Sequence, residues 1–373
     1  MRSGLNGKVR AHALQALFIE AGYAGCEPPI LQPANAFLDH AGEDLRGRLL
    51  LTADGVGEEL CLRPELTIPA CREWLAQGSP ESGQISCAGP VFRQRQAGPV
   101  EFYQAGLENF GRTDHQAADA EVLALVLGAV GKISKVPLHV TFGDAALFQH
   151  FVEGMGLPLA WRRRILRGHR AGKRLRDITD ALTPGDTVDH SGVLAALEGA
   201  DRAGARALVE DLLAIAGIAS VGGRSANEIA DRFLEQAGLR ASGPFPREKQ
   251  TWLEEFLQIG GEPDQALSDM RRLATVADID LEADFASFET RLGFFSAHGL
   301  DVAALNFSAA FTRPLDYYTG FMFEAHETST EHKNPVLGGG RYDHLMARLS
   351  GGRTIPALGA AVWVERLSGG VHG

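Results

Sequence analysis

The sequence contains no apolar run long enough to cross a membrane. A membrane-spanning helix needs roughly 20 consecutive apolar residues, whereas the longest apolar run here covers only residues 122–130 and already includes Gly128. The basic N-terminal segment is followed by no uninterrupted apolar core, so it does not resemble a signal peptide. We therefore expect a cytoplasmic protein.

Cysteine is scarce, and the common metal and catalytic motifs are missing. The 4 cysteines include no CxxC pair, which favours reduced thiols over disulfides or a metal site. His326 and His332 lie near each other without the further ligands that a closed metal site needs. The sequence has no HExxH, GxSxG or GxGxxG motif and no phosphate-binding P-loop. We expect no metal and no cofactor.

Positive charge is also in deficit. The formal net charge is −11, with 36 lysines and arginines against 47 aspartates and glutamates, which argues against a general nucleic-acid-binding protein. Residues 161–176 (WRRRILRGHRAGKRLR) form the one strongly basic stretch. This stretch is either a solvated helix face or a surface that meets an anion or an acidic partner, so it is a candidate partner interface.

The apolar pattern indicates an α+β protein with strands at both ends of the chain and helices between them. A length of 373 residues corresponds to roughly two to three domains. We expect one discontinuous core, residues 1–160 and 277–373, and a helical insertion over 161–276 with breaks at 183–185, 222–223 and 243–244. The elements expected in the core are a hairpin over 47–63 that turns at Asp54-Gly55, helices over 9–22 and 117–131, and strands over 84–93, 100–110, 138–142, 321–326 and 358–364.

Polar residues recur at alternate positions of the expected strands. If residues 102–108 form a strand, Gln104, Gly106 and Glu108 share one face, and the glycine leaves room for a ligand. Glu65 and Thr67 also lie two residues apart in an extended turn after Pro64, and Arg93 follows the end of a strand. Such carboxylates and guanidinium groups can hold a zwitterion, with Glu on its ammonium and Arg on its carboxylate. The alternative is that these residues pair with one another and have a structural role.

Several ordered motifs resemble histidyl-tRNA synthetase, a class II aminoacyl-tRNA synthetase. Residues 27–38 resemble the first class II motif, which builds a dimer interface, and residues 62–65 (LRPE) match a signature of the family. The further matches are the second motif over 92–111, Arg313, the histidine-specific segments 315–320 (LDYYTG) and 339–343 (GGRYD), and the third motif over 356–367. The resemblance implies an antiparallel sheet flanked by helices and a homodimeric core.

The same resemblance implies a histidine pocket. Glu65, Thr67 and Gln104 would hold the α-ammonium group. Glu108 and Tyr318 would meet the imidazole, with Tyr317 alongside, and Arg93 and Arg313 would face the carboxylate. An anionic Glu108 would favour histidine by a charge-assisted hydrogen bond worth roughly 1.5–3 kcal/mol.

Departures from the family pattern fall on the ATP side. Arg95 stands where the family has a glutamate that reads adenine, so an acceptor becomes a donor. Trp363 replaces a glycine that leaves space for the nucleotide. Arg366, which would stack on adenine, remains, while Pro314 replaces a glycine and could shift Arg313. Where the family continues with an anticodon-binding domain of about one hundred residues, only six residues follow Leu367, so we expect no tRNA partner.

With these departures the chain resembles the synthetase-like regulatory subunits of ATP phosphoribosyltransferase. That resemblance implies a non-catalytic protein without catalytic residues, which binds the short catalytic subunit, is required for its activity and takes part in feedback inhibition by L-histidine. Two alternatives stay open. One is a minimal ligase that adenylates histidine, and the other is a histidine sensor with a different partner.

Overall fold

The computed structural model describes residues 2–39, 43–78, 81–95, 98–179, 241–313, 317–328 and 334–368, with residues 204, 207–208, 210–211, 235–236 and 238–239. Residues 1–148 and 256–373 form one compact unit, and residues 149–255 form a second. The limits expected from composition, 161 and 276, differ from these boundaries. That the second unit is an insertion in a synthetase-like core stays a prediction.

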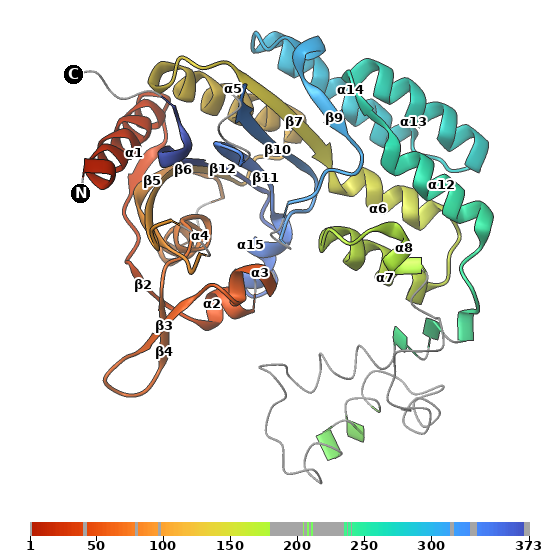
Figure 1. Cartoon of the computed structure of the whole chain (residues 1–373), viewed down its shortest axis with the longest axis horizontal. Coiled ribbons are helices and arrows are strands. Elements are labelled where there is room, and N and C mark those ends of the chain that lie inside the picture. The colour runs from red at the N-terminus through yellow and green to blue at the C-terminus, as the bar shows by residue number, and fades with distance from the viewer. Residues whose placement is uncertain are drawn as a thin grey trace. The chain divides into compact units, whose positions relative to one another are not determined.

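A nine-stranded mixed sheet forms the centre of the first unit (Figure 1). All neighbouring strands are antiparallel except two parallel pairs, β1 with β5 and β7 with β9. The strands lie in the order β1 (Ala24–Cys26), β5 (Gly83–Phe92), β6 (Glu101–Phe110), β12 (Ala357–Trp363), β11 (Leu337–Arg341), β10 (Phe321–Glu327), β7 (Leu138–Asp144), β9 (Asn306–Ser308) and β8 (Gly260–Gly261).

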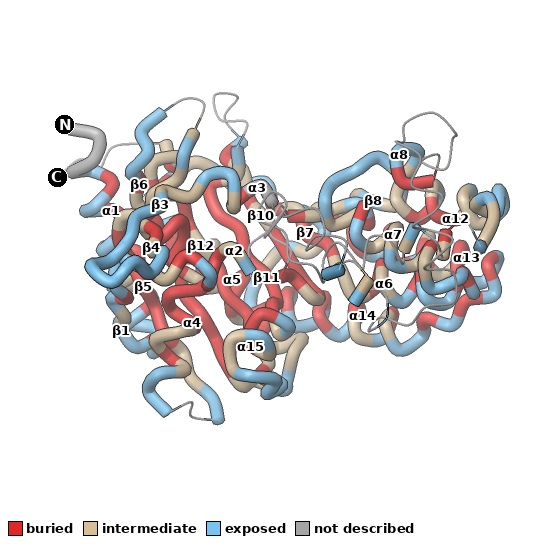
Figure 2. Tube along the Cα trace, turned by 90° about the horizontal axis from the view of Figure 1, so that it is seen from below, coloured by how far each residue is buried: buried red, intermediate tan, exposed pale blue. Residues whose placement is uncertain are grey.

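Helices cover both faces of this sheet. Consecutive residues of β6 point to opposite faces. On one face, α1 (Arg2–Glu20) brings Gly7 beside Tyr103, and α1 also packs against α5 (His115–Ile133). On the other face, Trp74 of α4 (Thr67–Ala76) stacks on Phe110 with ring centroids 4.4 Å apart, and α15 (Asp343–Leu349) packs against α4. The sheet curves around α4 in Figure 1, and buried residues follow its strands in Figure 2.

Three further helices of the first unit lie beside β8 and β9. They are α13 (Pro263–Ala277), α14 (Glu282–Ala297) and the short 3-10 helix η1 (Val302–Ala304). The helix α13 contacts β8, β9 and α14, which is why the second compact unit ends before the expected residue 276. The first unit also contains α2 (Asn35–Leu38), α3 (Glu43–Arg46) and the 3-10 helix η2 (Val364–Arg366).

A separate three-stranded antiparallel sheet has the order β2 (Leu31–Pro33), β4 (Glu59–Leu62) and β3 (Leu50–Ala53). The hairpin expected over 47–63 is confirmed, and it turns at Asp54-Gly55 as expected, where the backbone N–H of Gly57 donates to the oxygen of Asp54 at 3.3 Å. The chain turns over five residues, because the Asp54 carboxylate accepts hydrogen bonds from the backbone N–H groups of Val56 and Glu58, both at 2.9 Å. The left-handed backbone, with φ = 92°, falls at Gly57 instead of Gly55.

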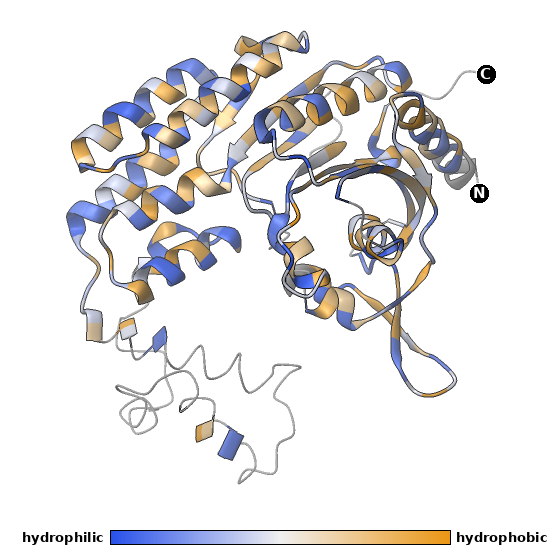
Figure 3. Cartoon of the chain, turned by 180° about the vertical axis from the view of Figure 1, so that it is seen from behind, coloured by the Kyte–Doolittle hydropathy of each residue, from blue (hydrophilic) through white to orange (hydrophobic). Residues whose placement is uncertain are grey.

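The described part of the second unit is helical. It includes α7 (Leu159–Arg170) and α8 (Leu175–Thr179), while α6 (Ala145–Gly154) and α12 (Arg247–Gln258) cross between the two units along the chain. Hydrophilic and hydrophobic residues occupy different sides of the helices in Figure 3. The expected breaks at 183–185 and 222–223 lie outside the described residues. The third expected break is present, because Gly243 has a left-handed backbone with φ = 69° and ends the helical pattern there.

The other expected helices and strands are confirmed, and their ends differ by at most two residues except at the first helix. The helix expected over 9–22 begins at Arg2 and ends before Gly22, whose φ of 99° suits a helix terminus. Sequence reasoning missed β11, which contains three consecutive glycines. Among the described residues, no helix has the length and apolar character needed to cross a membrane.

Candidate functional site

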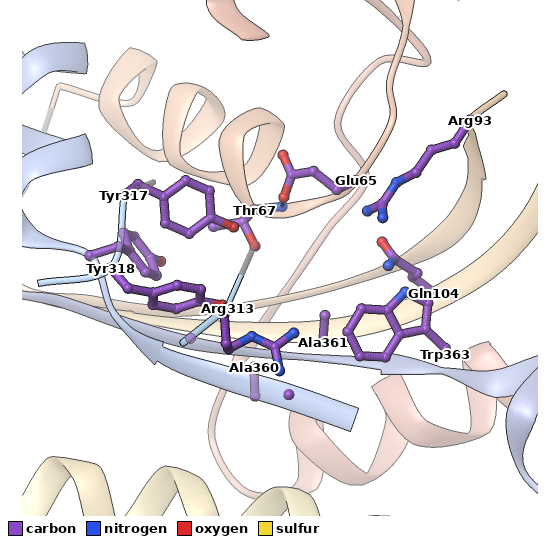
Figure 4. Close-up of a pocket in the computed structure, with 13 residues that line it drawn as sticks. Glu65, Thr67, Arg93, Gln104, Arg313, Tyr317, Tyr318, Ala360, Ala361 and Trp363 are labelled. Carbon is purple, nitrogen blue, oxygen red and sulfur yellow. Dashed lines mark hydrogen bonds between the residues drawn. The ribbon is translucent and has the colours of Figure 1, made fainter. Parts of the chain in front are cut away.

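A pocket opens on the face of the sheet that α4 and α15 cover (Figure 4). Its volume is about 370 Å³, counted with its opening to solvent. Tyr317 and Tyr318 lie at one end, and Arg93, Gln104 and Trp363 lie at the other. The full lining is Glu65, Thr67, Arg93, Gln104, Arg313, Tyr317, Tyr318, Gly338, Tyr342, Gly359, Ala360, Ala361 and Trp363.

Seven of the eight residues expected to bind histidine line this pocket. The eighth, Glu108, lies just beneath the lining. A Cβ atom on Gly359, which is opposite Glu108 in the β6–β12 register, would overlap Oε2 of Glu108. The structure therefore brings together residues from four separate parts of the chain. Residues 314–316, including Pro314, lie outside the described residues.

The side chain of Glu65, which lines the pocket, binds the backbone at the start of α4. Its Oε2 accepts a hydrogen bond from the backbone N–H of Thr67 at 2.7 Å, and its Oε1 accepts one from Ile68 at 2.8 Å. Burial raises the pKa of Glu65, while these two bonds and the charge of Arg93 act against that rise. A carboxylate has about four acceptor positions, so Glu65 can cap the helix and still accept from a ligand ammonium group.

Gln104 lies at the polar end of the pocket, and its side-chain oxygen accepts no hydrogen bond from the described residues. The β6–β12 register places it directly opposite Trp363. Only 1% of Gln104 is exposed, and its Oε1 has no hydrogen-bond partner among the described residues. A buried amide oxygen without a partner is costly unless a ligand or water satisfies it. Gln104 is therefore ready to accept a hydrogen bond from a ligand.

Glu108 is held by a tyrosine that is distant in sequence. The Tyr342 hydroxyl donates to Oε2 of Glu108, and the Cys71 thiol donates to Tyr342 at 3.8 Å. Burial raises the pKa of Glu108 to about 8, against the opposing effects of Tyr342 and Thr67. This shift favours the protonated carboxyl group near neutral pH in the unliganded protein, and an anionic Glu108 in the histidine complex stays a prediction.

Arg313 lies across β11, the strand that contains three consecutive glycines. Its Nη1 donates to the backbone oxygen of Phe323 at 3.3 Å and to Oε2 of Glu324 at 3.2 Å. A Cβ atom on Gly338 would overlap the guanidinium group, so glycine lets Arg313 lie directly against the strand. The guanidinium carbon is 5.8 Å from the Tyr318 ring and 5.7 Å from the Trp363 ring. Arg313 thus spans the two ends of the pocket.

The opposite face of β11 is fixed by buried ion pairs. Asp119 of α5 is 0% exposed and pairs with Arg341 of β11 at 2.8 Å and with Arg291 of α14 at 2.9 Å. Arg291 also reaches Asp144 at 3.1 Å. Burial lowers the pKa of Arg291, but the two aspartates overcome this effect and the net shift is upward. These pairs join α5, α14, β7 and β11 behind the glycine-rich floor of the pocket.

On the side where a synthetase binds ATP, arginines stack on aromatic side chains of the protein itself. The Arg366 guanidinium lies 4.6 Å from the centre of the Trp363 ring, and its Nη1 donates to the backbone oxygen of Pro335 at 2.6 Å. Arg95 lies 3.6 Å from the Phe102 ring centre. Burial lowers the pKa of Arg366 to about 10, and neighbouring arginines add to this effect. The arginine expected to stack on adenine therefore stacks on the indole of Trp363.

Sequence reasoning missed some residues that shape the site. Tyr342, Gly338 and Glu324 position Glu108 and Arg313 without lying in any expected ligand set. The run of three glycines was the available signal, because consecutive glycines in an otherwise ordered segment indicate close approach of other groups to the backbone. Among the described residues, no group of three or more His, Cys, Asp or Glu side chains could hold a metal ion.

Comparisons with known proteins point to one family. A family model described as histidyl-tRNA synthetase matches residues 6–219 and 204–367. The chain is 38% identical, over 346 residues, to the ATP phosphoribosyltransferase regulatory subunits of Brucella ovis and Brucella abortus, and the match covers 91% of this chain and 91% of each relative.

Solved structures share the fold. One is an ATP phosphoribosyltransferase regulatory subunit/histidyl-tRNA synthetase from Bacillus halodurans, with a TM-score of 0.62 and 20% identity, covering 98% of this chain and 79% of that chain. Another is a histidyl-tRNA synthetase from Nostoc, with a TM-score of 0.62 and 15% identity, covering 96% and 70%. The expected class II synthetase-like α+β fold is thereby confirmed.

Proposed function

The chain belongs to the histidyl-tRNA synthetase-like family of ATP phosphoribosyltransferase regulatory subunits, and we propose that it binds L-histidine in the pocket described above and passes that signal to a short catalytic subunit. Its role is regulatory, as a subunit of an enzyme of histidine biosynthesis. In this proposal the catalytic subunit needs the chain for activity, and histidine inhibits the complex by favouring one of its arrangements over another.

The two ends of the pocket support histidine as the ligand. Arg93 and Arg313 offer cationic groups for a carboxylate, while Glu65 and Gln104 offer acceptors for an ammonium group. The buried Glu108 carboxyl group lies under the aromatic end. It can share its proton with an imidazole, whose own pKa of about 6.5 is the nearest to neutral of any side chain.

Packing on the nucleotide side supports a non-catalytic role over a histidine-adenylating ligase. Trp363 fills the pocket wall, and Arg366 stacks on it in place of adenine. We expect the purified chain to give no ATP–pyrophosphate exchange with histidine. The Trp363→Gly variant should also give none, because Arg95 still presents a donor to the adenine position. Measured exchange in either protein would favour the ligase.

We also propose a homodimeric core, for which the three-stranded sheet offers a surface. The registers of β2, β3 and β4 place five apolar side chains on one face, and none of them is buried: Leu31, Pro33, Leu50, Leu60 and Leu62. Leu31 is 49% exposed. Contiguous exposed apolar surface of this kind is typical of protein–protein contacts, and a two-fold axis would pair this face with itself.

A reconstitution assay tests the proposed function. Purified short catalytic subunit is assayed for ATP phosphoribosyltransferase activity alone, with this chain, and with this chain plus L-histidine. We expect activity to depend on the chain and to fall when histidine is added. Full activity of the catalytic subunit alone, or no response to histidine in the complex, would contradict the proposal. Failure to restore activity, together with histidine binding, would favour a sensor with a different partner.

A further inference from the structure

Trp363 presents an unused hydrogen-bond donor to the pocket. Only 8% of the residue is exposed, and its indole Nε1 has no partner among the described residues. An indole N–H can only donate. When buried it normally finds an acceptor, because leaving it unpaired is costly. Trp363 lines the pocket, so a ligand in the pocket can supply that acceptor.

The indole is held firmly in place. The backbone N–H of Trp363 donates to the oxygen of Val336 at 2.8 Å, which fixes the end of β12. Arg366 lies against the ring at 4.6 Å and is itself fixed by its bond to Pro335. A donor held by packing and by its neighbours gives directional selectivity, since no ordering cost is added when the ligand binds.

The donor lies in a region suited to an anionic acceptor. Two guanidinium groups, those of Arg313 and Arg366, lie within 6 Å of the ring centre, at 5.7 and 4.6 Å. Arg93 lies at the same end of the pocket in Figure 4. A carboxylate is the acceptor that matches both a neutral N–H donor and surrounding arginines.

Trp363 also lies directly across the strands from Gln104, whose Oε1 is the unused acceptor. The Cβ atoms of directly opposed residues in an antiparallel pair are about 4.5–5.5 Å apart, so these two side chains start next to each other. An acceptor and a donor on neighbouring side chains suit the ammonium and carboxylate groups that an amino acid carries on one carbon atom. The two unused atoms therefore complement the two charged groups of a single α-amino acid.

We propose that the Trp363 indole N–H donates to the α-carboxylate of the bound amino acid and that the ring closes the pocket behind it. The site then selects the free amino acid over derivatives whose carboxylate is reduced, esterified or amidated. This inference rests on the proposed function, because it takes an amino acid as the occupant of the pocket. It gives the residue that replaces the family's nucleotide-space glycine a positive role in ligand selection.

Calorimetry with two ligands and three proteins tests this assignment. L-Histidine and L-histidinol, which lacks the carboxylate, are titrated into the wild-type chain, Trp363→Phe and the control Trp252→Phe. The phenylalanine variant keeps an aromatic ring at the pocket wall but has no N–H. Trp252 is a half-buried tryptophan on α12 and is not one of the residues that line the pocket.

We expect the wild type and Trp252→Phe to bind histidine far more tightly than histidinol. In Trp363→Phe, histidine affinity should fall roughly tenfold, as for loss of a hydrogen bond to a charged group, while histidinol affinity stays the same. If Trp363→Phe weakens the binding of both ligands equally, the donor role of Trp363 is overturned. The proposal that the wild-type chain binds histidine would still stand. A wild-type chain that binds no histidine would instead overturn the proposed function, and this inference with it.

A second measurement needs no variant, in case Trp363→Phe fails to fold. Histidine methyl ester and histidinamide are titrated into the wild-type chain. Both derivatives keep the ammonium and imidazole groups but cannot offer a carboxylate, so we expect them to bind at least tenfold more weakly than histidine. Affinities equal to that of histidine would overturn the inference.

Discussion

Glu108 shows how burial sets the charge of a binding residue. The carboxyl group lies under Gly359, accepts a bond from Tyr342, and has a pKa raised by burial to about 8. Before the ligand binds, the group is therefore mostly protonated at pH 7. An imidazole in the pocket can accept that proton and form a charge-assisted pair with the carboxylate, so Glu108 need not carry an unpaired buried charge when the pocket is empty.

This environment makes a pH-dependent stability prediction for Glu108→Gln. The pKa in the folded state is raised above the ordinary value of 4.5. The contribution of Glu108 to stability is thus fully present below pH 4.5 and is lost as pH rises through about 8. Glutamine can accept the same Tyr342 bond but cannot ionise. We expect the two proteins to melt at similar temperatures at pH 5 and the variant to melt higher at pH 8.5.

Differential scanning fluorimetry without ligand checks this prediction. A difference of roughly 1 kcal/mol corresponds to about 2–4 °C for a domain of this size. Comparing the two proteins at each pH removes the contributions of other buried carboxyl groups such as Glu65 and Asp119, whose pKa values burial also raises. Melting curves whose separation does not change with pH would contradict the proton assignment.

At the scale of single residues, the sequence predicted the members of the site better than their chemistry. The two-residue period of a strand is enough to place Gln104 and Glu108 on one face. The charge of Glu108 depends on Tyr342, which is 234 residues away in the chain. No local pattern contains that contact, so the sequence led us to expect an anion that burial disfavours.

Among the strands, β11 is the clearest case of a structure that local propensity hides. Glycine is depleted in strands, yet Gly338, Gly339 and Gly340 form the centre of this one. The missing side chains of these glycines leave room for other groups: Arg313 crosses Gly338, and the neighbouring strand passes close to Gly339. The ladders to β10 and β12 supply the stability that the residues themselves lack.

The glycine opposite Glu108 gives a second prediction. In Gly359→Ala the new methyl group would overlap Oε2 of Glu108 and displace it from Tyr342. We expect the free energy of unfolding to fall by about 1–3 kcal/mol, as for other overpacked sites, and histidine affinity to fall with it. Urea denaturation and calorimetry measure the two effects.

A matched glycine on a helix serves as the control. Gly128 lies in α5, is exposed, and has open space where a methyl group would go. Gly128→Ala should therefore raise the free energy of unfolding by about 0.5–1 kcal/mol and leave histidine affinity unchanged. If Gly359→Ala is as stable as Gly128→Ala, the close packing over Glu108 is not a constraint.

The ion pairs between α5, α14 and β11 give a third prediction. Asp119→Ala leaves Arg341 buried without its carboxylate partner, while Arg291 keeps its pair with Asp144. Breaking a buried pair from one side costs about 3–5 kcal/mol, because the remaining charge is uncompensated. We expect a loss of that size in urea denaturation. A loss below about 1 kcal/mol would mean that the arginines find other partners or water.

The hairpin shows why turn geometry was hard to predict. Asp-Gly is a strong signal for a two-residue turn, but Asp54 instead accepts bonds from two later N–H groups, and Gly57 takes the left-handed conformation. A second glycine three residues after Asp54 made the longer turn available. The sequence therefore predicts where the hairpin lies. The length of its turn depends on which of the two glycines takes the left-handed conformation.

At the scale of the whole molecule, the apolar face of the three-stranded sheet predicts self-association. A charged residue on this face should be costly in a dimer interface and cheap in a monomer, since Leu31 is half exposed. We expect Leu31→Asp to shift the chain from dimer to monomer in sedimentation velocity at micromolar concentration.

The control replaces an apolar residue that is more exposed and lies elsewhere. Val276 on α13 is 65% exposed and lies outside the three-stranded sheet. Val276→Asp should keep the sedimentation coefficient of the wild type. Equal behaviour of the two variants would show that the sheet face is not the dimer contact.

Regulation requires that the pocket and the catalytic partner influence each other. If histidine binding changes the partner's state, the partner's state must change histidine affinity by the same factor. Residues that bind histidine without contacting the partner should therefore separate inhibition from activation. Glu108 is suited to that test, because it is buried under the pocket and 3% exposed.

The most direct test is an inhibition curve for the reconstituted enzyme, measured with wild-type chain and with Glu108→Gln. We predict that both chains activate the catalytic subunit equally. The variant should need roughly 10- to 100-fold more histidine for half-maximal inhibition, as for loss of a charge-assisted hydrogen bond. Superimposed inhibition curves would contradict the claim that histidine acts through this pocket.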